Sequence, residues 1–232
     1  MTTRQTDEEY LYWEERQMAK KKTILVTCFE PYLDLPQNAS QEAVNLLPDE
    51  VGGCTIIKRS LPVKWFDCIY ELEQAIEEVR SVGVLATGQG YPVPPLLLER
   101  MGHNISCGPD ADFEMDLRDN PIFPGGPAGY FSTNPFAAMH ERLKKENIPV
   151  RYSFSAGQNQ CNCVLYTALH LAAHKYPAMT AGFIHVPMIP DGSHENMMST
   201  EEASRALLYC LEEYARSVNI PVRTLDEYME SL

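Results

Sequence analysis

The stretch "KTILVTCFEP" (residues 22–31) opens the folded body of the chain and predicts its first strand. Thr23–Thr27 is an apolar, β-branched run between a lysine and Pro31, and it shows no polar face. Runs of this kind are typical of strands that are covered on both sides, as in parallel sheets. We therefore expect a buried strand at this point.

Outward from this strand, apolar runs alternate with segments that have helical spacing or Ser/Thr caps. Further strands are predicted at residues 54–63, 82–88, 149–155, 181–187 and 222–225. Helices are predicted at residues 38–48, 64–80, 134–148, 163–175 and 199–217. Alternation of strands and helices predicts an α/β fold with a largely parallel sheet, covered on both faces.

The domain organisation follows from composition along the chain. Residues 1–20 are polar and charged and predict an N-terminal tail, whereas residues 21–232 contain no repeat and no low-complexity linker. We expect these to form one domain. Residues 103–133 are rich in Gly, Pro and Asp and predict a long loop, and loops of that length are either functional or mobile.

The bulk properties narrow the possible partners and the compartment. A net charge of −13 argues against a nucleic acid or an anionic membrane as partner, since both require a basic face. No apolar run reaches the length of a membrane span, and the N-terminus lacks the apolar stretch of a signal peptide. Seven scattered cysteines indicate free thiols in a reducing compartment, so we expect a cytoplasmic protein.

The stretch "FSAGQNQCNCVLY" (residues 154–166) carries the first candidate for chemistry. It joins a predicted strand to a predicted helix and puts Cys161 in the first helical turn. Unpaired peptide N–H groups and the helix dipole favour an anion there, so a thiol at that point is a candidate nucleophile. The alternative is a small buried hydrophobe, the usual environment of a free cysteine and the one we expect for Cys163.

A thiolate nucleophile needs a proton acceptor and a group that orients it. His185 lies at the end of the predicted strand 181–187, and the strands flanking the Cys161 helix predict a βαβ unit that brings the two together. Glu99 follows three leucines, and a carboxylate in such an apolar run needs a partner. That partner is His185 or the neighbouring Arg100, and His185 could instead be an ordinary core histidine.

No metal or cofactor site is predicted. His170 and His174 share a helix face, but Leu171 stands where a metalloprotease helix has its glutamate. The segment "GQGYPV" (residues 88–93) begins like a dinucleotide loop, yet its prolines cannot open a helix.

Five stretches together resemble the pyroglutamyl peptidase I family of cysteine exopeptidases. "VTCFEPYLDLPQNAS" is similar to the family's "VTGFEPFGG…NPS", and "LLLERMGHNI" to its "I-x-x-ERVAIN". "GPAGYFSTNP" and "SFSAGQNQCNCVLY" are similar to "GPAAYWSTLP" and "SAG-x-x-x-CN-x-x-x-Y", and "GFIHVPMIPD" to "GFIHVP-x-[IL]-PE". The resemblance covers roughly residues 22–215.

The resemblance implies a three-layer α/β/α fold, a frequent dimer or tetramer, and a substrate peptide with an N-terminal pyroglutamyl residue. It implies catalytic roles for Cys161 as nucleophile, His185 as base and Glu99 as the acid that orients the base. It also implies substrate-binding roles, which fall on Phe29, Tyr32 and Asn38. Phe29 and Tyr32 are expected in a loop, where core packing is the weaker alternative, and Asn38 could act only as a helix cap.

The chain departs from the family pattern near the expected site. Tyr91–Val93 replace the family's "GG-R", and Leu33 and Asp34 replace two glycines. These departures predict a change in specificity more than in reaction type. A hydrolase of other N-blocked amides or thioesters, and a non-catalytic binding protein on the same scaffold, therefore remain as alternatives.

Overall fold

The computed structural model describes residues 21–33, 35–92, 94–111, 113–190 and 197–219. The predicted N-terminal tail (residues 1–20) and the predicted strand at residues 222–225 lie outside this part of the chain.

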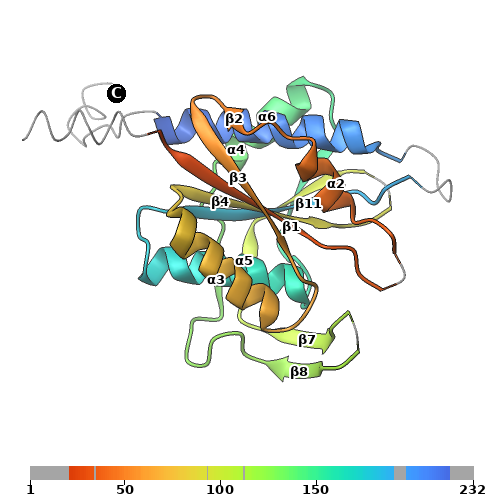
Figure 1. The fold of residues 1–232 in the computed structure, drawn as a ribbon, viewed down its shortest axis with the longest axis vertical. Helices are drawn as coiled ribbons and strands as arrows, with labels where there is room; N and C mark the ends of the chain where they lie inside the picture. The colour runs from red at the N-terminus through yellow and green to blue at the C-terminus, as the bar shows by residue number, and fades with distance from the viewer. Residues whose placement is uncertain (1–20, 34, 93, 112, 191–196, 220–232) are drawn as a thin grey trace, which may run out of the picture.

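The fold is a twisted sheet between two layers of helices, as predicted (Figure 1). The strands follow one another across the sheet as β10 (Val150–Ser153), β5 (Leu96–Glu99), β11 (Thr180–Val186), β4 (Gly83–Gln89), β1 (Thr23–Phe29), β3 (Cys54–Leu61) and β2 (Glu50–Val51). The four adjacent strands β11, β4, β1 and β3 are parallel, so their carboxyl ends meet at one edge of the sheet.

One expectation about strand direction is wrong. β5 pairs with β11 in the antiparallel sense, and β10 is parallel to β5. The strands before and after the Cys161 helix are therefore neither adjacent nor parallel, and they do not form the expected βαβ unit. β5 itself was not predicted as a strand, because four residues between prolines and charged residues give little periodicity.

Helices cover both faces of the sheet (Figure 1). On one face lie α3 (Asp67–Val79) and α5 (Gln160–His174), which pack against each other. On the other lie α2 (Ala39–Asn45), α4 (Phe136–Lys145) and α6 (Thr200–Asn219), with α6 packed on both of its companions.

The central strand β1 explains why the sheet needs two helical layers. Ile24 and Val26 are buried in the apolar cluster on the α2–α6 side, whereas Leu25 and Phe29 are buried in the cluster on the α3–α5 side. Because successive side chains of a strand point to opposite faces, an all-apolar strand exposes hydrophobic surface on both sides unless both are covered.

Helix starts follow the local sequence. At the start of α6, the Ser199 N–H donates to Glu202 and the Glu202 N–H donates to the Ser199 hydroxyl, which is a capping box. α3 begins at Asp67, three residues later than predicted, because Phe66 has φ 65° and lies outside the right-handed helical region.

Residues 103–133 are more ordered than the predicted loop. Together with Met101 and Gly102, the segment forms two small antiparallel sheets, one of β6 (Met101–His103) with β9 (Gly129–Phe131) and one of β7 (Ser106–Pro109) with β8 (Asp116–Asn120). The strands are short and largely solvent-facing, so the sequence lacks the apolar runs that would have revealed them.

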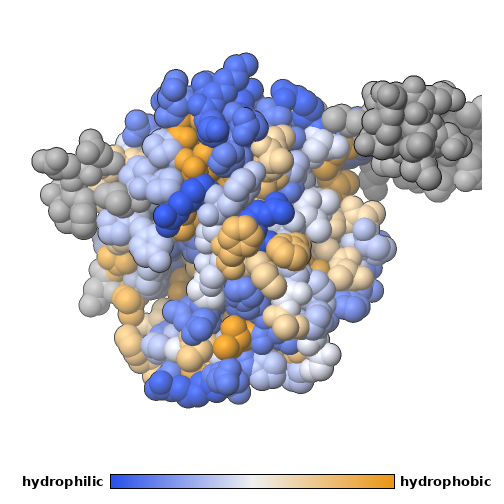
Figure 2. All heavy atoms as spheres, turned by 180° about the vertical axis from the view of Figure 1, so that it is seen from behind, coloured by the Kyte–Doolittle hydropathy of each residue, from blue (hydrophilic) through white to orange (hydrophobic). Residues whose placement is uncertain are grey.

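On the face opposite to that of Figure 1, hydrophilic residues dominate and no single broad hydrophobic area stands out (Figure 2). Within the described residues, every helix is too short or too polar to cross a membrane.

Candidate active site

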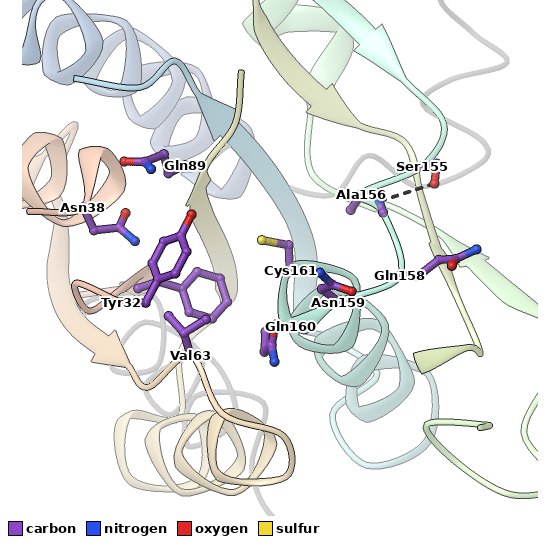
Figure 3. A pocket seen from close by; sticks show the side chains of 12 residues that line it. Tyr32, Asn38, Val63, Gln89, Ser155, Ala156, Gln158, Asn159, Gln160 and Cys161 are labelled. Carbon is purple, nitrogen blue, oxygen red and sulfur yellow. Dashed lines mark hydrogen bonds between the residues drawn. The ribbon is translucent and has the colours of Figure 1, made fainter. Parts of the chain in front are cut away.

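Cys161 is the second residue of α5 and lies in its first turn, as predicted. The N-cap residue Asn159 makes no side-chain capping hydrogen bond, and the first turn contains no acidic residue. The opening N–H groups of α5 therefore favour an anion beside the cavity into which the Cys161 sulfur points (Figure 3). Two residues on, Cys163 is buried in the core, also as predicted.

Two side chains of α5 fix this first turn against the segment 103–133. The Asn162 amide accepts from the His103 N–H and donates to the carbonyls of His103 and Ile105, at 2.8–2.9 Å. One turn further, the Tyr166 hydroxyl donates to the Pro127 carbonyl at 2.8 Å. The nucleophile candidate thus lies on a helix whose first two turns are anchored to the segment 103–133.

The approach of Cys161 to the sheet depends on Gly88 in β4. A Cβ atom on Gly88 would lie 3.1 Å from the Cys161 Sγ and 2.7 Å from the Phe183 Cζ. The second contact is closer than Cβ atoms tolerate, so a side chain at this position would displace the sulfur or the phenyl ring. Gly88 also pairs with His185 in the parallel ladder of β4 and β11.

His185 and Glu99 come together through the antiparallel pairing of β5 with β11. Leu97 lies opposite His185 in this pairing. Glu99 follows two residues later along β5 and therefore points to the same face of the sheet as Leu97 and His185. The His185 Nδ1 and Glu99 Oε1 are 2.8 Å apart, with the side chains 11% and 0% exposed. Arg100, the alternative partner, lies over the Tyr152 ring instead.

The surroundings of His185 favour the imidazolium. Burial lowers the pKa of His185, but the charge of Cys161, a hydrogen bond with Cys161 and the hydrogen bond and charge of Glu99 raise it to about 10. A proton held between a sulfur and a carboxylate is the arrangement that a thiol nucleophile with an oriented base requires.

A cavity of about 550 Å³ opens in front of the Cys161 sulfur. Tyr32 and Gln89 lie on the wall that faces the sulfur, and residues 155–158 form the wall on the other side (Figure 3). Burial and the neighbouring Cys161 raise the pKa of Tyr32, while a hydrogen bond with Gln89 acts in the opposite sense. The Tyr32 hydroxyl therefore stays protonated near the sulfur.

Phe29 and Asn38 line the cavity, but neither is a free loop side chain. β1 extends to Phe29, a residue that is 3% exposed and belongs to the core, so the expected loop position is wrong for this residue. The Asn38 oxygen caps α2 by accepting from the Ser40 N–H and hydroxyl, and its nitrogen donates to the Glu30 carbonyl. Asn38 thus positions the loop that carries Tyr32.

The sequence did not reveal several residues of the cavity wall. Gln89, whose side chain accepts from the Ala39 N–H at 2.9 Å, ties β4 to the start of α2. Val63 and the loop 155–158 also line the cavity. The glycine of the "SAG" element is the signal that could have indicated this loop, because Gly157 has φ 83°, a conformation that glycine adopts without strain.

His170 and His174, the two histidines of α5, share Tyr130 as a partner. The Tyr130 hydroxyl lies 2.9 Å from His170 Nδ1 and 2.9 Å from His174 Nε2. Among the described residues, no group of three or more His, Cys, Asp or Glu side chains is arranged to hold a metal ion.

Known sequences that match this chain point to one family. A sequence model of the family described as pyroglutamyl peptidase matches residues 22–226. Pyrrolidone-carboxylate peptidase of Thermococcus onnurineus is 38% identical over 192 residues, which are 82% of this chain and 94% of that protein. The protein of the same name from Thermosipho melanesiensis is 35% identical over 194 residues, covering 82% of this chain and 96% of its own.

Solved structures agree with this result. Pyroglutamyl peptidase I from Bacillus amyloliquefaciens superposes with a TM-score of 0.79 at 25% identity, covering 84% of this chain and 98% of that one. A mutant pyrrolidone carboxyl peptidase from Pyrococcus furiosus superposes with a TM-score of 0.79 at 31% identity, covering 84% and 99%.

Proposed function

The chain belongs to the pyroglutamyl peptidase family, and from this premise we propose that it is a cysteine exopeptidase that removes an N-terminal pyroglutamyl residue from peptides. The roles we propose are nucleophile for Cys161, base and acid for His185, and orienting acid for Glu99. The observation that carries the proposal is the buried Glu99–His185 pair of 2.8 Å, with Cys161 beside this imidazole at the open start of α5.

The reaction we propose proceeds through an acyl-enzyme. His185 takes the proton of Cys161, and the thiolate attacks the pyroglutamyl carbonyl while N–H groups at the start of α5 stabilise the oxyanion. His185 then gives its proton to the departing peptide amine, which leaves as the carbon–nitrogen bond breaks. Water, deprotonated by His185, hydrolyses the thioester and releases pyroglutamate and the free thiol.

The cavity supports an uncharged ring as the group that is bound. Its wall in front of the sulfur offers the aromatic rings of Phe29 and Tyr32 and the neutral amide of Gln89, and the described residues that line it include no charged side chain. A pyroglutamyl lactam is flat and neutral, with one N–H donor and one carbonyl acceptor, so aromatic and amide side chains complement it. In this proposal Phe29 and Tyr32 contact the ring, and Asn38 holds the Tyr32 loop.

The proposal also includes a cellular compartment and an oligomeric state. A thiol nucleophile works only while it is reduced, and Cys161 is a partly exposed free thiol, so we propose that the enzyme acts in the cytoplasm. From the family resemblance we further propose a homodimer or homotetramer, which light scattering on the purified protein tests.

The test of the proposed function compares the native protein with Cys161→Ala on a fluorogenic pyroglutamyl amide under reducing conditions. We expect turnover by the native protein and a loss of at least about 10⁴-fold in the variant, as for removal of a covalent nucleophile. Native protein that is folded but inactive on this amide would overturn the proposed substrate, and a panel of other N-blocked amides and thioesters would follow. Activity that survives in Cys161→Ala would overturn the proposed nucleophile.

A further inference from the structure

A second, smaller cavity adjoins the first on the imidazole side. It has a volume of about 240 Å³ and is lined by His185, Leu97 and Tyr91. Gln89 and residues 155–157 line both cavities, so the two meet across the Cys161–His185 pair. The larger cavity holds the sulfur, and the smaller one holds the imidazole.

The chemistry of the proposed reaction assigns a side of the scissile bond to each cavity. The acyl group becomes bonded to Cys161 and stays in the larger cavity. The departing amine receives its proton from His185, so the residue that carries this amine lies against the imidazole. Its side chain then faces the smaller cavity.

The lining of the smaller cavity favours an apolar side chain. Among the described residues that line it, Glu99 is the one charged group apart from His185, and it is fully buried and paired with that histidine. Leu97 contributes apolar surface from β5. The volume lies below the roughly 300–1,000 Å³ of cavities that take a whole small-molecule ligand, which suits a single side chain.

Tyr91 is an exposed aromatic residue on a fixed backbone. Its side chain belongs to a residue that is 67% exposed. On one side the Gly90 N–H donates to the Val186 carbonyl at 2.8 Å, and on the other the Tyr91 carbonyl accepts from the Met188 N–H at 3.0 Å. The backbone of Tyr91 is therefore fixed beside the smaller cavity, and its side chain is left mostly uncovered, so a ligand can bury it.

We propose that Tyr91 and Leu97 form a subsite for the residue that follows the pyroglutamyl group, and that this subsite prefers an aromatic or large apolar side chain to a small or acidic one. The inference rests on the proposed function and adds a specificity determinant to it. An acidic side chain is disfavoured because, among the described residues that line the smaller cavity, the one cation is the His185 imidazolium, which is already paired with Glu99.

The test measures kcat/KM for three amidated dipeptides, in which pyroglutamate is followed by phenylalanine, alanine or glutamate. For the native protein we expect phenylalanine to exceed alanine by about tenfold and glutamate to be the slowest. Tyr91→Ala should bring the phenylalanine-to-alanine ratio close to one, whereas Tyr91→Phe should keep it. Tyr70→Ala removes a tyrosine of α3 that is 60% exposed and lines neither cavity, so the ratio should not change.

The outcomes separate the two proposals. Hydrolysis of all three peptides at equal rates, or a ratio unchanged in a folded Tyr91→Ala variant, would overturn the subsite and leave the proposed function standing. Failure of the native protein to cleave any of the three would overturn the proposed function and the subsite with it. Circular dichroism of each variant establishes that it is folded.

Discussion

Helix α5 has a cavity at each end, and the two are of similar size. The cavity at its amino end, of about 550 Å³, contains Cys161. The cavity at its carboxyl end, of about 620 Å³, is lined by Lys175 and Met179 after α5 and by Glu77 and Arg80 from the end of α3. Volume alone therefore does not distinguish a site for chemistry in this protein.

The two ends differ in polarity and in the burial of their ion pairs. The amino end of a helix favours an anion such as a thiolate, whereas the carboxyl end favours cations such as Lys175. The Glu99–His185 pair beside the first cavity is almost fully buried, while the Lys175–Glu77 pair beside the second is more than half exposed. Exposed pairs are screened by water and contribute little, whereas a buried pair can hold a proton in place.

The largest effect that tests the difference between the two ends of α5 is expected for Glu99→Gln. Replacing the carboxylate by an amide of equal size should lower kcat/KM by about 10²- to 10⁴-fold, because His185 loses the group that orients and charges it. Burial lowers the pKa of His185, and Cys161 and Glu99 raise it to about 10. In the variant this pKa is lower, so the alkaline fall in kcat/KM should move to lower pH.

The same pair has a predicted effect on stability. Because the folded-state pKa of His185 is raised above its unfolded value of about 6.5, its contribution to the free energy of unfolding is complete below that value. It is lost as the pH rises through about 10. Urea unfolding at several alkaline pH values measures this loss, which should be smaller in Glu99→Gln. If Glu99→Gln changed neither the alkaline fall in kcat/KM nor the alkaline loss of stability, Glu99 would not be a cause of the raised pKa of His185.

A smaller effect is expected for Tyr32→Phe, which removes only a hydroxyl from the wall of the reactive cavity. The loss of one neutral hydrogen-bonding group should raise KM for a pyroglutamyl amide by about threefold to tenfold and leave kcat less affected. Steady-state kinetics separates the two parameters. A fall in kcat with unchanged KM would instead assign the hydroxyl to the reaction itself.

The smallest effect is expected for Glu77→Gln at the other end of α5, which repeats the carboxylate-to-amide change in an exposed pair. We expect kcat/KM within about twofold of the native value and a change in Tm below about 2 °C. Fluorogenic kinetics and thermal unfolding provide the check. A large loss of activity here would break the distinction between the two ends of the helix.

The elements predicted correctly are those whose residues all point to one structure. β1 and β4 are buried runs without a charged residue, and the capping box of Ser199 and Glu202 indicates the start of α6. Cys161 could be placed in a first turn because the apolar positions of α5 recur at helical spacing. Local pattern was sufficient in these places because burial and propensity agree.

The elements that were missed depend on pairing that has no local signal. β5 has only four residues, and its antiparallel direction is set by contacts with β11, far away in the chain. The residues alone left the partner of Glu99 open between His185 and Arg100, and the family resemblance implied His185. The geometry of that pair came from an arrangement of strands that the sequence did not indicate. Gln89 was overlooked because its role depends on α2 and Tyr32 lying beside the end of β4.

The register between β5 and β11 also limits how this gene can change in length. Because side chains alternate along a strand, a one-residue insertion or deletion within Leu96–Glu99 would turn the carboxylate to the α2–α6 face, among apolar side chains. A two-residue change would restore the face but move the carboxylate by about 7 Å, out of reach of the imidazole. Substitutions can accumulate at Leu96 and Leu98 as long as they stay apolar, but the spacing of this strand is fixed.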